Sequence, residues 1–197
     1  MILDIVTYGH PVLRTRGRKI TALGERLYTL AADMIETMYA NELVGMAAHQ
    51  VGKAVQMFVL GVPQDEKQPS QMWMAGKQAP LEEHMPLVVI NPKIATEGEM
   101  QIGIEGSPCL PGVYGEVKRP LGVSLHAQDL DNKPIELRAQ GLLARAIQHE
   151  MDHLQAILFF DRMDDQARRK LGSSIYEQIT NFSSPLHGDK IRSDRWS

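Results

Sequence analysis

The sequence predicts an α+β fold in which antiparallel strands pack around a central metal-binding helix, with a further helix near the C-terminus. Segments with strand character lie mostly between residues 55 and 137, whereas helical periodicity is found before and after them. Elements segregated in this way favour α+β over a doubly wound parallel sheet. A third observation, a pair of histidines four positions apart in the helix that follows the strands, predicts the metal.

The first part of the chain contains one clear helix. Residues 2–8 predict a short strand, which Gly9-His10-Pro11 would end. From residue 23 to residue 40, apolar side chains recur every three or four positions, as in an amphipathic helix. Residues 41–52 predict a loop with small residues at its centre, and the apolar run 55–60 predicts a strand.

The middle of the chain predicts the rest of the sheet. Residues 62–86 carry four prolines and many polar side chains, so we expect a long excursion between strands. The alternating segments 123–127 and 135–137 flank the turn 129–133 and predict a hairpin. Further strands are expected over residues 87–90, 93–104 and 113–118.

Helical periodicity returns over residues 140–154, and a last helix is predicted over 164–180, where Asp164 and Asp165 suit the positive helix N-terminus. A chain of 197 residues with 43% apolar residues fits one domain. We expect that domain over residues 1–180 and a polar tail over 181–197.

Composition excludes several classes of protein. A net charge of -3 argues against a basic nucleic-acid binder, and no run of 18 apolar residues predicts a membrane span. The only cysteine, Cys109, excludes an internal disulfide and fits a reducing compartment. The first residues lack the pattern of a signal or transit peptide. We therefore expect a cytoplasmic monomer that binds neither DNA nor a membrane.

The strongest chemical signal is H-E-M-D-H at residues 149–153. His149 and His153 lie one helical turn apart on the same face, so both imidazoles can reach one divalent metal. Glu150 lies beside that face and could take a proton from water whose pKa the metal lowers. The alternative is a helix with two incidental histidines and a solvated glutamate.

The third ligand distinguishes between enzyme classes. H-E-x-x-H alone is typical of metalloproteases, but residues 155–161 contain no further histidine. Asp161 and Asp164 are carboxylate alternatives. Cys109 would complete a His₂Cys set with an open fourth position, which is a catalytic arrangement.

Three motifs resemble the peptide deformylase family, in that family's order. Residues 43–50, L-V-G-M-A-A-H-Q, resemble G-x-G-L-A-A-x-Q. Residues 105–111, E-G-S-P-C-L-P, resemble E-G-C-L-S in disturbed form, and residues 148–154 match Q-H-E-x-D-H-L in full. The similarity covers about residues 2–165.

The resemblance implies a hydrolase that removes the formyl group from the N-terminal formyl-methionine of nascent peptides. It implies Fe²⁺ as the metal, and the ligand types would also accept Zn²⁺. By resemblance, His149 and His153 bind the metal, and Glu150 is general base and acid. The side-chain amide of Gln50 and the backbone N–H after the ligand cysteine, here Leu110, would hold the oxyanion. Contacts with substrate are expected at Gly45, Met46, Glu105, Gly106 and Arg119. Met46 and Met151 could shape a pocket for the methionine side chain.

The second motif allows two registers. Without gaps, Ser107 falls on the ligand cysteine and Pro108, which has no N–H, falls on the oxyanion donor. With a shift of two residues, Cys109 is the ligand and Leu110 the donor, and side-chain parity is kept if the segment is a strand. We prefer Cys109, because thiolate is the better soft-metal ligand. Leu43 is a second departure, since it replaces the first glycine of its motif.

These departures keep other functions open. One is a deformylase-like protein of weak or no activity that binds formyl-peptides or ribosomes. Another is a metalloprotease or metal amidase of different specificity, which would cleave internal peptide bonds. The last is a protein without metal, in which Cys109 is only a buried or reactive thiol.

Overall fold

The computed structural model describes residues 1–169 and 171–172. It confirms the α+β prediction, because seven antiparallel strands form one sheet in the order β1-β2-β5-β6-β7-β3-β4. The strands are β1 (Gly45–Ala47), β2 (Met57–Leu60), β3 (Ser70–Met74), β4 (Lys77–Gln78), β5 (Leu87–Gly106), β6 (Tyr114–Gln128) and β7 (Pro134–Gly141). The helices are α1 (Glu25–Ala40) and α2 (Leu142–Leu154), with short 3₁₀ helices η1 (Pro11–Arg14), η2 (Ala48–Val51) and η3 (Phe159–Arg162).

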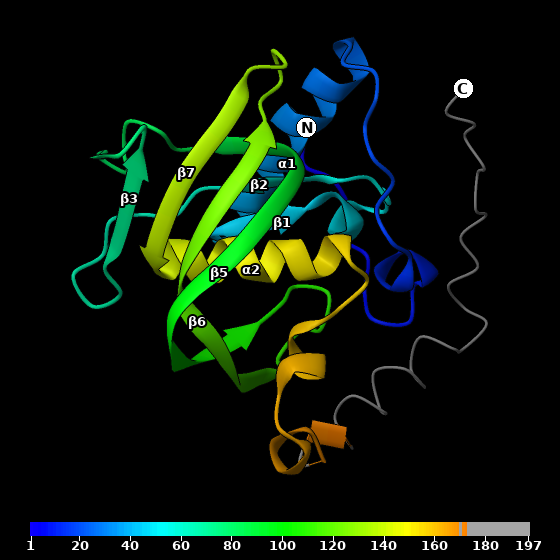
Figure 1. The fold of residues 1–197 in the computed structure, drawn as a ribbon. Helices are drawn as coiled ribbons and strands as arrows, with labels where there is room; N and C mark the ends of the chain where they lie inside the picture. Colours follow the sequence, from blue (N-terminus) through cyan, green and yellow to red (C-terminus); the bar gives the residue numbers. More distant parts are fainter. Residues whose placement is uncertain (170, 173–197) are drawn as a thin grey trace.

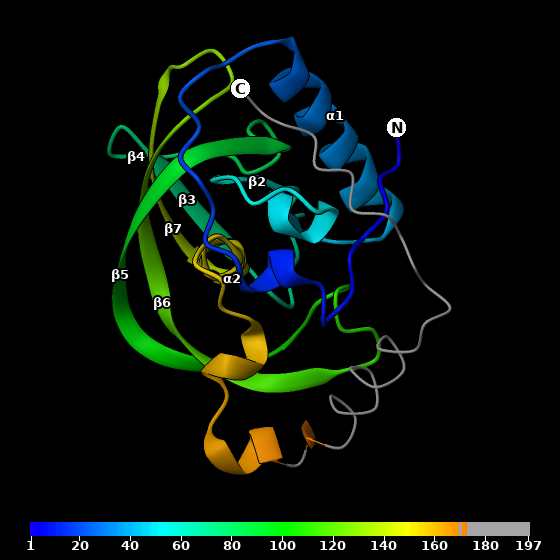
Figure 2. The same ribbon diagram turned by 90° about the vertical axis from the view of Figure 1, so that its right-hand side faces the viewer.

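The helix α2 lies at the centre of the fold. Figure 1 shows it crossing the strands, and Figure 2 views it almost end-on, with β5 and β6 curving around it. Leu143, Ala144 and Ile147 are fully buried against the sheet. Their spacing of one, three and four positions forms the apolar stripe that the periodicity of residues 140–154 predicts.

The strand β2 explains why residues 57–60 form an uninterrupted apolar run. Phe58 and Leu60 pack in the cluster that contains α2. Met57 and Val59 point the other way, into the cluster that contains α1. A strand that is covered on both faces has no polar side to alternate with.

The long strand β5 joins two segments that the sequence predicts as separate. The pairing with β6 shifts register between Ile90 and Lys93, and Asn91 has a φ of 52°. The Asn91 side chain accepts a hydrogen bond from Ile20 N–H and donates one to Ile20 C=O, both at 2.8 Å. A β-bulge held in this way lets the strand continue through Asn91-Pro92. The segments 113–118 and 123–127 likewise belong to the single strand β6.

The prediction of a strand over residues 2–8 is wrong. Val6 N–H donates to Gln50 C=O, whereas Tyr8 N–H donates to Cys109 C=O. Leu3 N–H donates to the Thr37 hydroxyl at 2.9 Å. Because these donors go to three separate parts of the chain, the segment forms no ladder.

Two expected loops contain strands. Residues 41–52 include β1 and η2, and residues 62–86 include β3, which pairs with β7 and β4. The Ser70 hydroxyl accepts a hydrogen bond from Leu143 N–H at 3.0 Å. It therefore satisfies one of the free N–H groups in the first turn of α2.

The two helical predictions that frame the sheet are confirmed as α1 and α2, each with a start two residues later than expected. Residues 165–169 begin the predicted C-terminal helix. The rest of that helix is largely outside the described residues, and the predicted tail over 181–197 is wholly outside them. In the described part of the chain, no helix has the length and apolarity needed to cross a membrane.

Gly141, at the junction of β7 and α2, supports a specific prediction about stability. Its φ is 74°, and a Cβ built on it would lie 2.0 Å from Pro69 C=O. We expect Gly141→Ala to lower the free energy of unfolding by about 3 kcal/mol, because backbone strain and a collision with rigid backbone coincide. Gly76→Ala is the matched control, since φ is 76° and nothing lies within 4 Å of the added Cβ. It should cost about 1 kcal/mol. Urea denaturation measures both, and equal losses would contradict the collision.

Candidate active site

The helix α2 brings His149, Glu150 and His153 to one place. The two imidazole rings have centroids 5.0 Å apart and lie edge to face. Both nitrogens of His153 and Oε2 of Glu150 are buried and have no hydrogen-bond partner among the described residues. Buried polar atoms are rarely left unpaired, because each costs free energy. Unpaired imidazole nitrogens in this position fit the binding of a divalent metal ion, for which imidazole is a common ligand. Burial also lowers the pKa of His153 well below its ordinary value, which favours the neutral form that binds metals.

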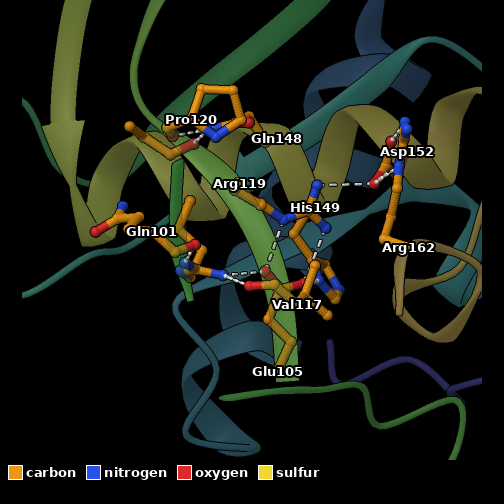
Figure 3. A network of polar contacts seen from close by, with 11 residues as sticks. Gln101, Glu105, Val117, Arg119, Pro120, Gln148, His149, Asp152 and Arg162 are labelled. Atoms are coloured by element: carbon orange, nitrogen blue, oxygen red, sulfur yellow. Dashed lines mark hydrogen bonds and ion pairs between the residues drawn. The ribbon is translucent and has the colours of Figure 1, made fainter. Parts of the chain in front are cut away.

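Glu105 fixes the orientation of His149. Its carboxylate accepts hydrogen bonds from Nε and Nη2 of Arg119 at 2.6 and 2.8 Å and from Nη1 of Arg145 at 2.7 Å. It also pairs with Nδ1 of His149 at 2.9 Å, as Figure 3 shows. With Nδ1 engaged, Nε2 is the nitrogen left to bind a metal.

The network around Glu105 continues along α2. Nη1 of Arg119 donates to Asp152 at 2.9 Å, and Nη2 of Arg162 donates to the same carboxylate at 2.6 Å (Figure 3). Burial alone would raise the pKa of Glu105, but hydrogen bonds from Arg119 and His149 outweigh it and hold the pKa well below its ordinary value. Glu105 and Arg119 have side chains only 5% and 4% exposed. Arg119 therefore lies behind Glu105 and is connected to His149 through that carboxylate, so it does not offer an open surface to a substrate.

Glu150 has a different environment. Burial raises its pKa to about 7, against the opposing effects of His149 and the Ala47 N–H. A Cβ built on Gly45 would lie 2.7 Å from Oε1 of Glu150, so only glycine leaves room there. This carboxyl group can take up and release a proton near neutral pH, as a general base and acid must.

Gln50 is oriented by its own loop. Its Oε1 accepts a hydrogen bond from Ala47 N–H at 2.6 Å, which leaves Nε2 to donate. Nε2 lies 3.5 Å from the Ser107 hydroxyl. The amide N–H of Gln50 is therefore fixed toward the segment that follows β5.

Residues 107–110, which follow β5, form a tight turn. Leu110 N–H donates to Ser107 C=O at 2.9 Å, and Cys109 N–H donates to the Ser107 hydroxyl at 3.3 Å. The Cys109 side chain is buried and interacts with Ser107 and Gln50, and burial raises the pKa of its thiol to about 12. In the described part of the chain, no three His, Cys, Asp or Glu side chains are grouped to hold a metal ion. The structure thus pairs His149 with His153 and leaves the third ligand unassigned.

A hollow of about 180 Å³ opens beside these groups. Gln50, His149 and Glu150 line it together with Gly45, Glu105 and Gly106, all expected from the sequence. Met46 and Met151 do not line it. Met46 is fully buried in the cluster with α1, and Met151, itself on α2, packs against the core cluster that contains Leu143 and Ile147.

Several lining residues are not among the substrate contacts expected from the sequence. The apolar wall of the hollow consists of Leu43, Val44, Ile104, Leu142 and Ala146. Its lining also includes Pro108 and Arg145. Leu142, Arg145 and Ala146 precede His149 by seven, four and three positions. Helical spacing from His149 could therefore have identified them.

Comparison with known proteins decides the family. The model of the family described as polypeptide deformylase matches residues 2–169. The chain belongs to the peptide deformylase family. The peptide deformylase of Opitutus terrae is 38% identical over 192 residues, which are 95% of this chain and 99% of the relative. That of Methylacidiphilum infernorum is 40% identical over 171 residues, 87% of this chain and 90% of the relative.

Solved structures agree with this assignment. Crystallised peptide deformylase 1B of Arabidopsis thaliana has a TM-score of 0.77 and 32% identity, over 91% of this chain and 92% of that chain. The peptide deformylase of Thermotoga maritima has a TM-score of 0.71 and 32% identity, over 83% of this chain and 99% of that chain. The family is one of metal-dependent hydrolases, and the chain is a deformylase-type enzyme.

The Glu105–Arg119 pair supports a prediction. We expect Glu105→Gln to lower the free energy of unfolding by about 3 kcal/mol, because it leaves the buried Arg119 with Asp152 as its remaining charged partner. Glu97→Gln is the matched control, since Glu97 pairs with Arg138 in the same sheet but both side chains are exposed. It should cost less than about 1 kcal/mol. Chemical denaturation measures both, and similar small losses would show that the buried network does not stabilise the fold.

Proposed function

We propose that this enzyme removes the N-formyl group from formyl-methionine at the start of nascent peptides, releasing formate and a free amine. One observation carries the proposal. On a single helix, Glu150 with a pKa of about 7 lies beside the paired imidazoles of His149 and His153, and Glu150 and His149 line one hollow with Gln50. Proton transfer, metal binding and an amide N–H donor are what hydrolysis of a formamide requires.

We propose His149 and His153 as two ligands of a divalent metal, Fe²⁺ with Zn²⁺ as the other candidate. A metal bound there supplies a Lewis acid that makes water nucleophilic near neutral pH. The residues around it provide orientation. Glu105 holds Nδ1 of His149, so the imidazole keeps one ring position in the absence of any ligand.

Glu150 is the proposed proton carrier. It takes a proton as water adds to the formyl carbon, and it gives that proton to the amine that leaves. Its pKa of about 7 suits both directions of transfer. Gly45 leaves its carboxyl group unobstructed, and the backbone of β1 can approach substrate closely there.

The negative oxygen that develops on the formyl group needs fixed donors. Gln50 supplies one, because Ala47 N–H holds its amide oxygen and leaves Nε2 to donate. Pro108 has no N–H, and Leu110 N–H is bonded to Ser107 C=O. We therefore propose Gln50 as the principal donor. A contribution from Leu110 requires that bond to open.

We propose that the turn after β5 supplies the third ligand, with Cys109 preferred and Ser107 as the alternative. Thiolate is the stronger donor for Fe²⁺ or Zn²⁺. The Cys109 thiol already contacts Gln50, and Ser107 lies between it and the end of β5. Without a metal, burial raises the pKa of the thiol to about 12. Metal binding would displace the thiol proton.

The apolar part of the hollow fits the methionine side chain. Val44, Leu142 and Ala146 line it next to His149 and Glu150. We further propose that the protein works in the cytoplasm as a monomer on chains emerging from ribosomes. This step rests on the proposed substrate, because formyl-methionine occurs at the start of new chains.

The bonded N–H of Leu110 favours a second candidate function. A site with one oxyanion donor fewer could bind formyl-methionyl peptides and hydrolyse them slowly. This candidate predicts peptide binding in the micromolar range with formate release at least about 100-fold slower than from an active family member.

We expect Glu150→Gln to lower formate release from a formyl-methionyl tripeptide by at least about 100-fold, because proton transfer is lost. Metal content should stay unchanged, since Glu150 is not a proposed ligand. Glu136→Gln, whose side chain is 73% exposed on β7, is the control and should leave both unchanged. A coupled formate assay and metal analysis measure the two effects. Full activity in Glu150→Gln would exclude the assigned role.

The third ligand can be tested by metal affinity. If Cys109 binds the metal, Cys109→Ala should weaken binding of Co²⁺ by more than about 100-fold, beyond the loss typical of outer-shell changes. The thiolate absorption of the Co²⁺ protein should also disappear. Ser107→Ala is the matched variant, two positions away in the same turn, and should leave both unchanged. Loss of Co²⁺ affinity in Ser107→Ala but not in Cys109→Ala would assign Ser107, and unchanged affinity in both variants would contradict a ligand from this turn.

A further inference from the structure

A second hollow adjoins the one at the proposed active site. Its volume is about 470 Å³, and its lining includes Gln71, Gln101, Gly103 and Gln140. Leu142 and Arg145 are the two residues that line both hollows. These side chains, from the first turn of α2, therefore form the partition between the two spaces.

Three hydrogen bonds hold Arg145 in the partition. Nη1 donates to Oε1 of Glu105 at 2.7 Å and to Val117 C=O at 3.1 Å. Nη2 donates to Gln101 C=O at 3.1 Å. The side chain is 11% exposed, so it spans from α2 to β5 and β6 in one fixed position. A planar guanidinium bonded on two edges resists displacement more than a flexible aliphatic chain does.

Gly103 makes this position available. A Cβ built on Gly103 would lie 2.7 Å from Cζ of Arg145 and 2.9 Å from its Nε. Any larger residue on β5 would occupy the space in which the guanidinium lies. The absence of a side chain at Gly103 on β5 thus leaves the space that the guanidinium of Arg145, from α2, occupies.

We propose that Arg145 determines specificity, as the wall that limits the depth of the apolar part of the active-site hollow. The inference rests on the proposed function. Arg145 lies four residues before His149, one helical turn from the reacting groups. Its methylene stem continues the apolar lining of Leu142 and Ala146, while its charged end is bonded to Glu105. A wall at this position closes the apolar end of the hollow, so that it admits the flexible side chain of methionine and excludes large aromatic side chains.

The test compares formyl-tripeptides that start with methionine or tryptophan, on the metal-loaded full-length enzyme. Arg145→Ala joins the two hollows, so kcat/KM for the tryptophan peptide should rise at least about 10-fold relative to the methionine peptide. The ratio matters because loss of the bond to Glu105 also lowers absolute rates. The change should arise mainly in KM.

Two matched variants distinguish the effect of the size of the Arg145 side chain from the effect of its hydrogen bond to Glu105. Arg145→Met keeps the length of the side chain but loses the bond to Glu105, so the selectivity ratio should stay near that of the wild type while rates fall. Arg162→Ala disturbs the same polar network at Asp152 and lines neither hollow, so it should leave the ratio unchanged. Thermal unfolding confirms that each variant is folded.

The outcomes are distinct. An equal loss for both peptides in Arg145→Ala, with a ratio within about 2-fold of the wild type, would overturn the wall and leave Arg145 as a positioning residue for Glu105. If the wild type releases no formate from either peptide, the proposed function fails. In that case the same ratio is measured as calorimetric affinity for the two peptides. A gain for the tryptophan peptide in Arg145→Ala supports the wall, and no gain overturns it.

Discussion

The carboxylate of Glu105 is the point on which the rest of the site depends. It receives hydrogen bonds from Arg119 on β6, and from Arg145 and His149 on α2, while it is itself part of β5. A buried charge without partners is strongly destabilising, so the three elements must meet in one arrangement. The position of the histidine pair and the boundary of the hollow at Arg145 both follow from that arrangement. The charge network therefore sets the geometry of the site, and the apolar contacts of α2 hold the helix against the sheet.

The pKa values of two glutamates in this site are shifted in opposite directions because their surroundings differ. Glu105 is surrounded by cationic N–H donors, which keep it ionised despite burial. Glu150 is also buried, but no arginine of the described residues is bonded to it, so burial dominates and its pKa rises to about 7. The same side chain is thus a fixed anion in one position and suits the proposed proton carrier in the other. Gly45 preserves the difference, because any side chain there would press against the carboxyl group of Glu150.

The sequence predicts the parts of the fold that depend on local patterns. The periodicity of residues 140–154 and the H-E-x-x-H spacing identify α2 and its functional face, and the alternation at residues 123–127 identifies the hairpin. Contacts between distant residues could not be predicted in this way. The strand β3 lies in a segment of polar and proline-rich character and is defined by pairing with β7, about 70 residues later. The bulge at Asn91 depends on its hydrogen bonds to Ile20, which lies 71 residues earlier. The contact between Arg145 and Glu105 joins residues that are 40 positions apart, so no local pattern predicts it.

The altered turn after β5 shows how much of such a site can change. Pro108 removes one N–H from the chain, and the geometry of residues 107–110 commits the N–H of Leu110 to Ser107 C=O. The amide oxygen of Gln50 does not depend on that turn, because Ala47 N–H holds it. Glu150, His149 and His153 come from α2, which Leu143 and Ile147 anchor in the core independently of that turn. Changes in the second motif therefore act on the proposed third ligand and on one proposed oxyanion donor, the N–H of Leu110. They leave the proposed proton carrier Glu150, the histidine pair and the network of Glu105 intact.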